Sequence, residues 1–190
     1  MSSHFYAMLS RMKNIYRWGL MRNTRQENLS EHSLEVAFIA HALAIIRNRR
    51  FGGSVDANAV AVAAMFHDTS EIITGDMPTP IKYYNANIKN VYKEIEGIAK
   101  NRLVELLPED MRDDFAPVYS PSDESERLIK AADKISALIK CIEERNSGNR
   151  EFVSAEKSTL DAIKKLNLPE ADVFLKEFLD SYSLTLDELK

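Results

Sequence analysis

The apolar positions of this chain recur with the spacing of α-helices. From Ser30 to about Arg49 they fall three or four residues apart, as on one face of a helix. Ser30 can cap the start of this helix, and the Phe-Gly-Gly sequence at 51–53 can end it. The apolar positions of the predicted helix include Leu34, Phe38, Leu43 and Ile46.

A second helix is predicted from a cap at Asp56 to about Ile72, with Val60, Ala63 and Ala64 on its apolar side. The sequence TGDMPTP at 74–80 follows it. We expect a loop there, because one glycine and two prolines interrupt regular structure.

Helical patterns account for most of the remaining chain. They predict helices at about 87–107, 122–146, 150–166 and 169–180, and no segment shows the strict alternation of a β-strand. The sequence therefore predicts an all-α protein with a single domain at 1–190. Within it we expect a motif-bearing core at about 4–150 and C-terminal helices at about 150–190.

Composition is that of a globular protein outside the membrane. The chain has 190 residues, of which 45% are hydrophobic. Its longest apolar run, 36–46, is too short to cross a bilayer, and no charged head precedes an apolar run at the N-terminus. Cys141 is the only cysteine, so an internal disulfide is excluded and a reducing cytoplasm is indicated.

Charge is unevenly distributed. Residues 1–26 hold five basic and no acidic residues, whereas the whole chain has a net charge of −4. An acidic body argues against binding to a nucleic-acid polymer, which requires a basic face. The basic N-terminal segment could attract a smaller anion such as a phosphate, or it could be an ordinary solvated surface.

Three titratable residues lie together where the second predicted helix ends. His67 and Asp68 are adjacent, and Glu71 follows at helical spacing, beside both of them. A His-Asp pair alone is a weak signal, because such pairs arise by chance. Three such groups crowded at a helix end would destabilise one another unless a cation joined them. A metal ion is therefore a candidate ligand.

His32 and Asp133 are candidate partners of that cluster. His32 is in line with the apolar stripe of its helix and should point inward, either as a metal ligand or as a core histidine bonded to a carbonyl. His41 should face the other way, and we assign it no role. Asp133 lies at the edge of a buried stripe, as a ligand or as an exposed aspartate paired with Lys130 or Lys140.

Two imidazoles and two carboxylates favour a divalent first-row metal such as Mn, Co or Fe, with positions left for water. A structural zinc site is not expected without thiolates. Water on such a metal has a lowered pKa and can attack phosphorus or carbon near neutral pH.

These residues carry a resemblance to a known family. His32, His67-Asp68 and Asp133 resemble the H…HD…D pattern of the HD-domain phosphohydrolases. The segments RWGLMRNTRQENLSEHSLEVA, FHDTSEIITGDMPTPIKYYN and KAADKISALIKCIEE look like the bacterial HD-domain 5′-deoxynucleotidases. The resemblance covers most of residues 4–150 and is thinner beyond. It implies an HD-type helical bundle, a homodimer, and hydrolysis of deoxyribonucleoside 5′-monophosphates.

The resemblance also implies roles for individual residues. One divalent metal ion, Co²⁺ or Mn²⁺, would be held by His32, His67, Asp68 and Asp133. Glu71 and Arg17 would be catalytic, Arg17 through its planar fork of donors on the phosphate. The substrate would be bound by Arg17, Trp18, His32, Asp68, Asp76, Met77, Pro78 and Thr79.

Other interpretations stay open at this point. Arg17 could be an ordinary surface arginine, Trp18 a core anchor, and Asp76 and Thr79 simple turn residues. The chain could be another HD-type hydrolase, acting on a nucleoside triphosphate or a guanosine alarmone, although its acidic body argues against more phosphates. It could also be a non-catalytic, nucleotide-binding helical protein with an idle metal site.

Overall fold

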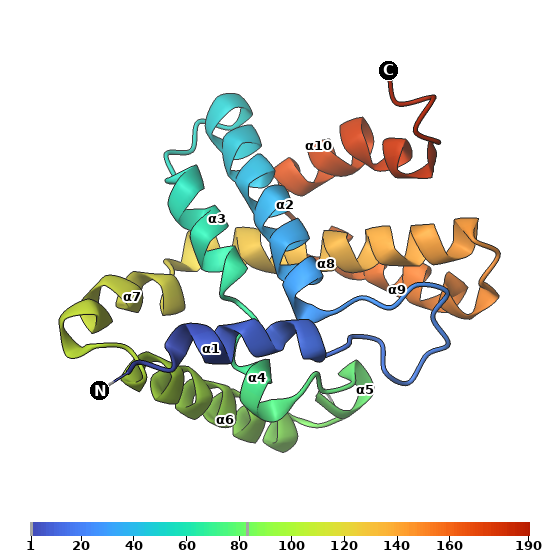
Figure 1. The fold of residues 1–190 in the computed structure, drawn as a ribbon. Coiled ribbons are helices and arrows are strands. Elements are labelled where there is room, and N and C mark those ends of the chain that lie inside the picture. Colours follow the sequence, from blue (N-terminus) through green and yellow to red (C-terminus); the bar gives the residue numbers. More distant parts are fainter. Residues whose placement is uncertain (1, 83) are drawn as a thin grey trace.

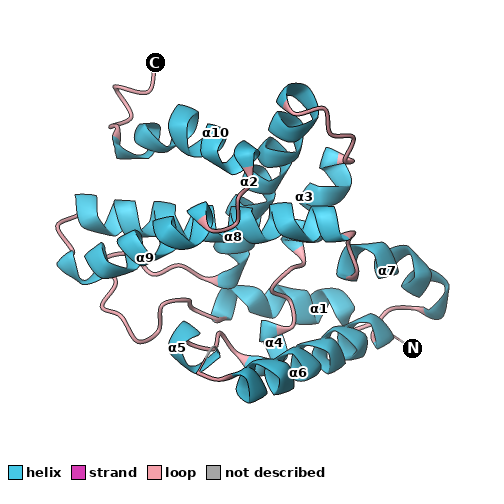
Figure 2. Ribbon diagram, turned by 180° about the vertical axis from the view of Figure 1, so that it is seen from behind, coloured by secondary structure: helices cyan, strands magenta, loops and turns pink. Residues whose placement is uncertain are grey.

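The computed structural model describes residues 2–82 and 84–190, with Thr79 by its backbone alone, and it is built from helices (Figures 1 and 2). Among these residues there is no β-strand, only an isolated bridge between Tyr16 and Asn28. The α-helices are α1 (Phe5–Leu9), α2 (Leu29–Arg50), α3 (Ala57–Met65), α4 (Glu71–Thr74), α5 (Thr79–Lys82), α6 (Ala86–Glu105), α7 (Arg112–Tyr119), α8 (Asp123–Asn146), α9 (Val153–Lys164) and α10 (Pro169–Phe178). The predicted all-α class is confirmed; the division of the domain at about 150 stays a prediction.

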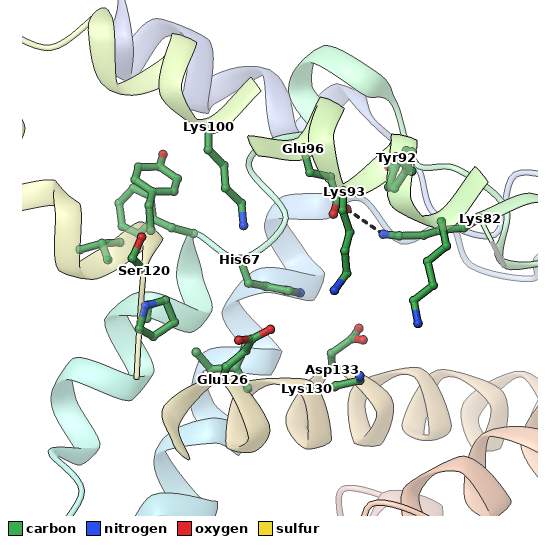
Figure 3. Close-up of a pocket in the computed structure, with 17 residues that line it drawn as sticks. His67, Lys82, Tyr92, Lys93, Glu96, Lys100, Ser120, Glu126, Lys130 and Asp133 are labelled. Atoms are coloured by element: carbon green, nitrogen blue, oxygen red, sulfur yellow. Dashed lines mark hydrogen bonds and ion pairs between the residues drawn. The ribbon is translucent and has the colours of Figure 1, made fainter. Parts of the chain in front are cut away.

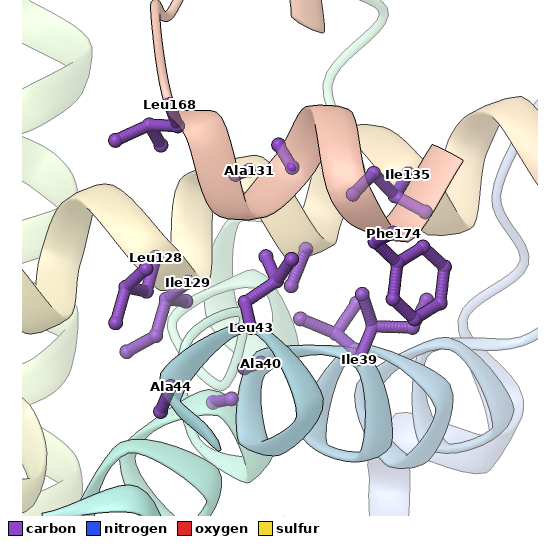
Figure 4. Packing of buried hydrophobic residues seen from close by; sticks show 14 of the residues in the cluster. Ile39, Ala40, Leu43, Ala44, Leu128, Ile129, Ala131, Ile135, Leu168 and Phe174 are labelled. Carbon is purple, nitrogen blue, oxygen red and sulfur yellow. The ribbon is translucent and has the colours of Figure 1, made fainter. Parts of the chain in front are cut away.

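The larger apolar cluster lies where α2, α3, α8 and α10 pack together (Figure 4). Ile39 and Leu43 of α2 face Ile135 of α8 and Phe174 of α10, and each of these side chains is buried. Burial of one large aliphatic side chain stabilises the fold by about 1.5–3 kcal/mol. This cluster fixes the relative positions of α2, α3 and α8.

A second, smaller apolar cluster joins α1, α6 and α7. Phe5 is fully buried and meets the ring of Phe115 edge to face, with centroids 5.1 Å apart. Leu103 and Leu107 are buried beneath it, and Phe66 packs against the same group. Figure 1 shows α1 lying between α6 and the layer that holds α2 and α8. The fold therefore has two apolar centres with a seam between them.

The cap of α2 lies two residues before the predicted cap, Ser30. It is Asn28, whose Oδ1 accepts from the backbone N–H groups of Ser30 and Glu31, while the Asn28 N–H donates to the Glu31 side chain. The stripe that α3, α8 and α10 cover runs through Val36, Ile39, Ala40, Leu43 and Ala44, among others, and it is the stripe in line with His32 that was predicted to face the core. Two other apolar positions of the helix, Leu34 and Phe38, are 49% and 66% exposed.

Helix α2 is also the one helix in the described residues that is long and apolar enough to cross a membrane. Length and composition alone select it, and 56% of its most apolar window is buried inside the protein. It is the central core helix of this fold, and a core helix passes the same test.

Three other boundaries differ from the prediction. The second helix ends at Met65, not near residue 72, and a turn at 66–70 separates it from α4. The short helix α5 begins within the predicted 74–80 loop and runs beyond it, although Gly75, at φ 73°, does end α4 there. Helix α7 occupies the predicted link before α8, and Pro117 lies inside it.

The carboxylate of Glu144 on α8 holds the N-terminal loop against the core. It accepts hydrogen bonds from the backbone N–H groups of Thr24 and Arg25, from the Thr24 hydroxyl at 2.6 Å, and from Lys140 at 2.5 Å. Burial acts in the opposite sense, but these donors, with Asn149, hold the pKa of Glu144 far below its ordinary value. The loop that follows Arg17 and Trp18 thus depends on one buried anion.

We expect Glu144→Gln to destabilise the fold by about 3–5 kcal/mol at pH 7, the range for breaking a buried charge pair. Because the folded pKa is depressed, this contribution is present above the unfolded pKa and is lost as pH falls through the acid range. The difference in free energy of unfolding, measured with urea, should therefore shrink below about pH 4. The exposed neighbour variant Glu143→Gln should change stability little at any pH. An equal loss of stability in both variants would contradict the role of Glu144 in holding the N-terminal loop.

Candidate metal centre

The turn between α3 and α4 carries the chain across the seam between the two clusters. Ala64 is buried in the larger cluster, whereas Phe66 packs in the smaller one, edge to face with Phe115. The Thr69 hydroxyl donates to the Phe66 carbonyl at 2.8 Å and closes the turn. His67 and Asp68 follow directly and are held at the seam.

His67 has its tautomer fixed by the backbone. Its Nδ1 lies 2.7 Å from the Ala64 carbonyl, which can only accept, so Nδ1 carries the proton. In the neutral ring the lone pair is then on Nε2. Burial would lower the pKa of His67, but the Asp68 carboxylate raises it above its ordinary value and so draws a cation to this atom. That atom is buried and has no hydrogen-bond partner in the described part of the chain, although it lies 3.1 Å from Asp68 Oδ2. A buried imidazole with a free lone pair is suited to bind a metal ion.

His32 reaches the same point from α2. It is fully buried, and its Nε2 lies 3.6 Å from Asp68 Oδ2 and, like that of His67, lacks a hydrogen-bond partner among described residues. Ligand atoms of His32, His67 and Asp68 all lie within 4.8 Å of one another. The structure thus brings these three predicted ligands together from two segments of the sequence.

Asp133 approaches from α8. Its Oδ1 lies 3.2 Å from His32 Nε2, although Asp133 is outside the tightest group of three. Its second ion pair is with Arg17, at 3.8 Å. The alternative of a pair with Lys140 is not what the structure has, because Lys140 binds Glu144 and the Arg25 carbonyl.

Electrostatics in the cluster favour anionic carboxylates and a cation. Burial would raise the pKa of Asp68, but His67 and His32 hold it far below its ordinary value. Asp133 is lowered to a pKa of about 2, against burial, by its contact with His32. Burial and then Arg17 lower the pKa of His32, which keeps that imidazole neutral. Two carboxylates and two free Nε2 atoms fit a divalent metal ion.

Glu71 lies one turn beyond the ligands and differs from them. It is 5% exposed, and its Oε2 is buried with no hydrogen-bond partner in the described structure. Burial, followed by the charges of Asp68 and Asp76, raises its pKa to about 9. A buried carboxyl with a raised pKa is typical of a proton-transfer group.

Arg17 and Trp18 are both held by Glu27, a residue that the sequence did not single out. The same oxygen, Glu27 Oε2, accepts from Arg17 NH1 at 2.7 Å and from Trp18 Nε1 at 3.1 Å. The backbone repeats the link, because the Arg17 N–H donates to the Glu27 carbonyl at 2.9 Å. Arg17 is therefore mostly buried and no ordinary surface arginine. The sequence offers only a weak indication of the role of Glu27, which is the first acidic residue after the basic N-terminal segment.

Two further groups missed by the sequence support His32 from behind. Its Nδ1 lies 3.0 Å from the Ser136 hydroxyl, which donates to Glu35 at 2.5 Å. Ser136 is fully buried on α8. Such partners fix the orientation of a ligating imidazole. Their residue types in helical patterns gave no sign of this contact.

The predicted substrate loop begins beside these groups. Asp76 is half-buried, and this burial raises its pKa. The charge of Arg17 and a hydrogen bond from the backbone of Trp18 act in the opposite direction. Met77 and Pro78 are half-buried in the same loop. The predicted contact of Thr79 lies in a side chain outside the described residues. Trp18 has φ 60°, a left-handed backbone that is costly for a tryptophan and often marks functional sites.

Comparison with solved structures identifies the fold. An HD-domain phosphohydrolase from Listeria innocua is 24% identical, with a TM-score of 0.80 over 94% of this chain and 88% of that one. The cyanophage S-2L HD phosphohydrolase DatZ, bound to dA and one catalytic Zn²⁺ ion, is 17% identical, with a TM-score of 0.67 over 92% of this chain and 96% of that one. The fold is that of the HD-domain phosphohydrolases.

Sequence comparison narrows the class. Residues 4–182 match the family described as 5′-deoxynucleotidase YfbR-like. The 5′-deoxynucleotidase YfbR of Shigella flexneri is 51% identical over 98% of this chain and 96% of its own length. A 5′-deoxynucleotidase of Vibrio vulnificus is 50% identical over 98% of both chains. This chain belongs to the YfbR-like 5′-deoxynucleotidase family.

If the four predicted ligands share one ion, His67→Ala and Asp133→Ala should each weaken binding of a divalent metal by at least about 100-fold, since even supporting residues are worth 10–100-fold. His41→Ala, half-buried on the same helix as His32, serves as the matched control and should keep the metal. The metal content of each variant after dialysis, measured by elemental analysis, tests this prediction. Full occupancy in Asp133→Ala would remove α8 from the site.

Proposed function

We propose that this chain is a metal-dependent 5′-deoxynucleotidase, which hydrolyses deoxyribonucleoside 5′-monophosphates to a deoxynucleoside and phosphate. The observation that carries this proposal is the buried group of His32, His67 and Asp68, with two unpartnered Nε2 atoms. It lies in a chain half identical to 5′-deoxynucleotidases over nearly its full length.

The bound metal would be one divalent ion, Co²⁺ or Mn²⁺, held by His32, His67, Asp68 and Asp133. Such an ion lowers the pKa of a bound water and neutralises charge on phosphate oxygens. The mixed nitrogen and oxygen donors support this choice of metal over soft ions. Both Nε2 atoms lack a hydrogen-bond partner among the described residues, and His32 becomes a ligand when its proton is on Nδ1, toward Ser136.

Arg17 would orient the phosphate. Its guanidinium lies 3.8 Å from Asp133 and close to His32, so its free donors border the metal centre. A planar fork matches two phosphate oxygens in a way that a lysine cannot. Glu27 holds this fork in place without using all five of its donors.

Glu71 would transfer the proton. The leaving 5′-oxygen of the deoxynucleoside needs a proton, and a protonated buried carboxyl beside the ligands can supply it. Its raised pKa keeps the proton available near neutral pH. The residue is positioned by the short helix α4, whose N-terminal backbone N–H donates to the Asp68 carbonyl at 2.9 Å.

The sugar would lie between Trp18 and the loop at 76–79. Asp76 would accept from the 3′-hydroxyl, with Met77, Pro78 and Thr79 forming the rest of the contact. Trp18 would occupy the space next to the 2′ position, because its ring is held by Glu27 and packs 5.3 Å from the ring of Phe152. A ring fixed on two sides can exclude an added hydroxyl.

The alternative functions are less well supported by these findings. A hydrolase of triphosphates or alarmones would share this fold, but family membership favours the monophosphate. An idle metal site would not need a buried Glu71 with a raised pKa beside a complete donor set. A homodimer and a cytoplasmic location stay predictions that rest on the family resemblance.

We expect Glu71→Gln to slow hydrolysis of dAMP by about 10²–10⁴-fold, the usual contribution of a positioned proton-transfer group. The amide keeps the shape of the side chain, so metal content and dAMP binding should be unchanged. Glu94→Gln, an exposed site on α6, should match the parent in rate. Loss of metal from Glu71→Gln would instead make Glu71 a ligand.

The proposed function itself is tested by comparing dAMP with AMP. The parent should favour dAMP by up to about 100-fold, since one misplaced buried hydrogen bond costs about 1–3 kcal/mol. Trp18→Ala should reduce that preference by accepting AMP better. Phosphate release, followed under saturating metal, gives both ratios. Equal rates on the two nucleotides in the parent would refute discrimination against the 2′-hydroxyl. An unchanged ratio of the dAMP and AMP rates in Trp18→Ala would show that Trp18 takes no part in it.

A further inference from the structure

A cavity of about 570 Å³ opens beside the metal centre (Figure 3). His67 and Asp133 lie in its wall, but the groups proposed to hold the substrate, Arg17, Trp18 and Asp76, do not. The rest of the wall comes from α5, α6, the end of α7 with the link that follows it, and α8, together with Ala63 and Phe66. Its volume is that of a small-molecule site.

Lysine is the most frequent residue in this wall. Five lysines line it, against three acidic residues, in a chain whose net charge is −4. The lysines are Lys82, Lys89, Lys93, Lys100 and Lys130. A concave surface lined by one sign of charge concentrates ions of the opposite sign. This is a local reversal of the acidic character of the chain.

Three of these charges have no partner within the protein. Lys82 forms an ion pair with Glu96, 2.9 Å away. Only two acidic residues of the wall then remain for the other lysines. Lys93, Lys100 and Lys130 make no hydrogen bond or ion pair among the residues that the structure describes. Figure 3 shows Lys93 and Lys100 pointing from α6 into the cavity, toward His67 and Asp133. A bound anion would relieve the repulsion between their ammonium groups.

The spacing of these ammonium groups indicates the kind of anion. Lys93 and Lys100 are seven residues apart on one helix, about 10 Å along its axis, and Lys130 faces them from α8. A chain of linked phosphates is long enough to contact all three at once. Apolar side chains also line the cavity, Phe66, Val118 and Pro121 among them.

We propose that this lysine cavity is a second anion site, which binds a polyphosphate chain, either free or as the tail of a nucleoside triphosphate. It is separate from the Arg17 phosphate site. Because His67 and Asp133 border both sites, a bound polyphosphate places negative charge beside the incoming monophosphate. It therefore inhibits hydrolysis, a consequence that rests on the proposed function.

The test uses the metal-loaded full chain and inorganic tripolyphosphate, with metal in excess over the polyphosphate. Calorimetry should show binding that the double variant Lys93→Ala/Lys100→Ala weakens by about 10- to 100-fold, because each hydrogen bond between charged groups is worth roughly a factor of ten. Lys157→Ala/Lys164→Ala is the matched control. Its two exposed lysines are also seven residues apart, on α9, and do not line the cavity. This control should bind like the parent.

Two further arms separate the outcomes. Arg17→Ala should still bind tripolyphosphate; loss of binding there, or an equal loss in both double variants, would overturn the proposal. ATP binding tighter than tripolyphosphate would assign the site to a nucleotide, and equal affinity would assign it to the free polyphosphate. Hydrolysis of dAMP by the parent is measured separately. Because tripolyphosphate binding needs no turnover, the two measurements distinguish failure of the proposed function from failure of the proposed anion site.

Discussion

The passage of the chain from one apolar cluster to the other, between Ala64 and Phe66, determines the rest of the site. Phe66 must bury its ring against Phe115, so the helix cannot continue past Met65. The turn that results releases the Ala64 carbonyl to His67 and directs His67 and Asp68 into the seam. Apolar packing on both sides of the turn thus positions the polar side chains of the predicted metal centre.

His32 links the metal side of the site to the phosphate side. Its Nδ1 lies 2.8 Å from Arg17 NH1, and arginine can only donate, so that contact requires the histidine proton on Nε2. A ligand role requires the reverse, with Nδ1 donating to Ser136 and Nε2 bare. Arg17 can therefore keep its contact with Glu27 in both cases but not its contact with His32. The position of the phosphate fork and the state of the metal centre are coupled through one imidazole.

Helical periodicity predicted the inward side of His32 and the grouping of His67, Asp68 and Glu71, because these depend on local spacing. The roles themselves came from a family resemblance. Glu27 and the Ser136–Glu35 pair were missed because neither contact follows helical spacing. Glu27 acts on residues nine and ten positions away, and Ser136 and Glu35 meet between helices α8 and α2. The lysines of α6 were missed for a related reason: on one helix they look like a solvated face, and only Lys130 of α8 shows that they border a cavity. Leu34 and Phe38 are apolar but exposed, because apolar character alone does not say which face of a helix another element covers.

The predicted ligands of this centre come from α2, the turn after α3, and α8, and His32 and Asp133 are 101 positions apart in the sequence. No shorter segment of the chain holds them all, and each loop that joins them must close at an entropic cost before any two can meet. Local helices can form earlier without creating a place for the ion. The centre therefore forms only when α2, α3 and α8 have packed together, and a chain that ends before α8 lacks one of its predicted ligands.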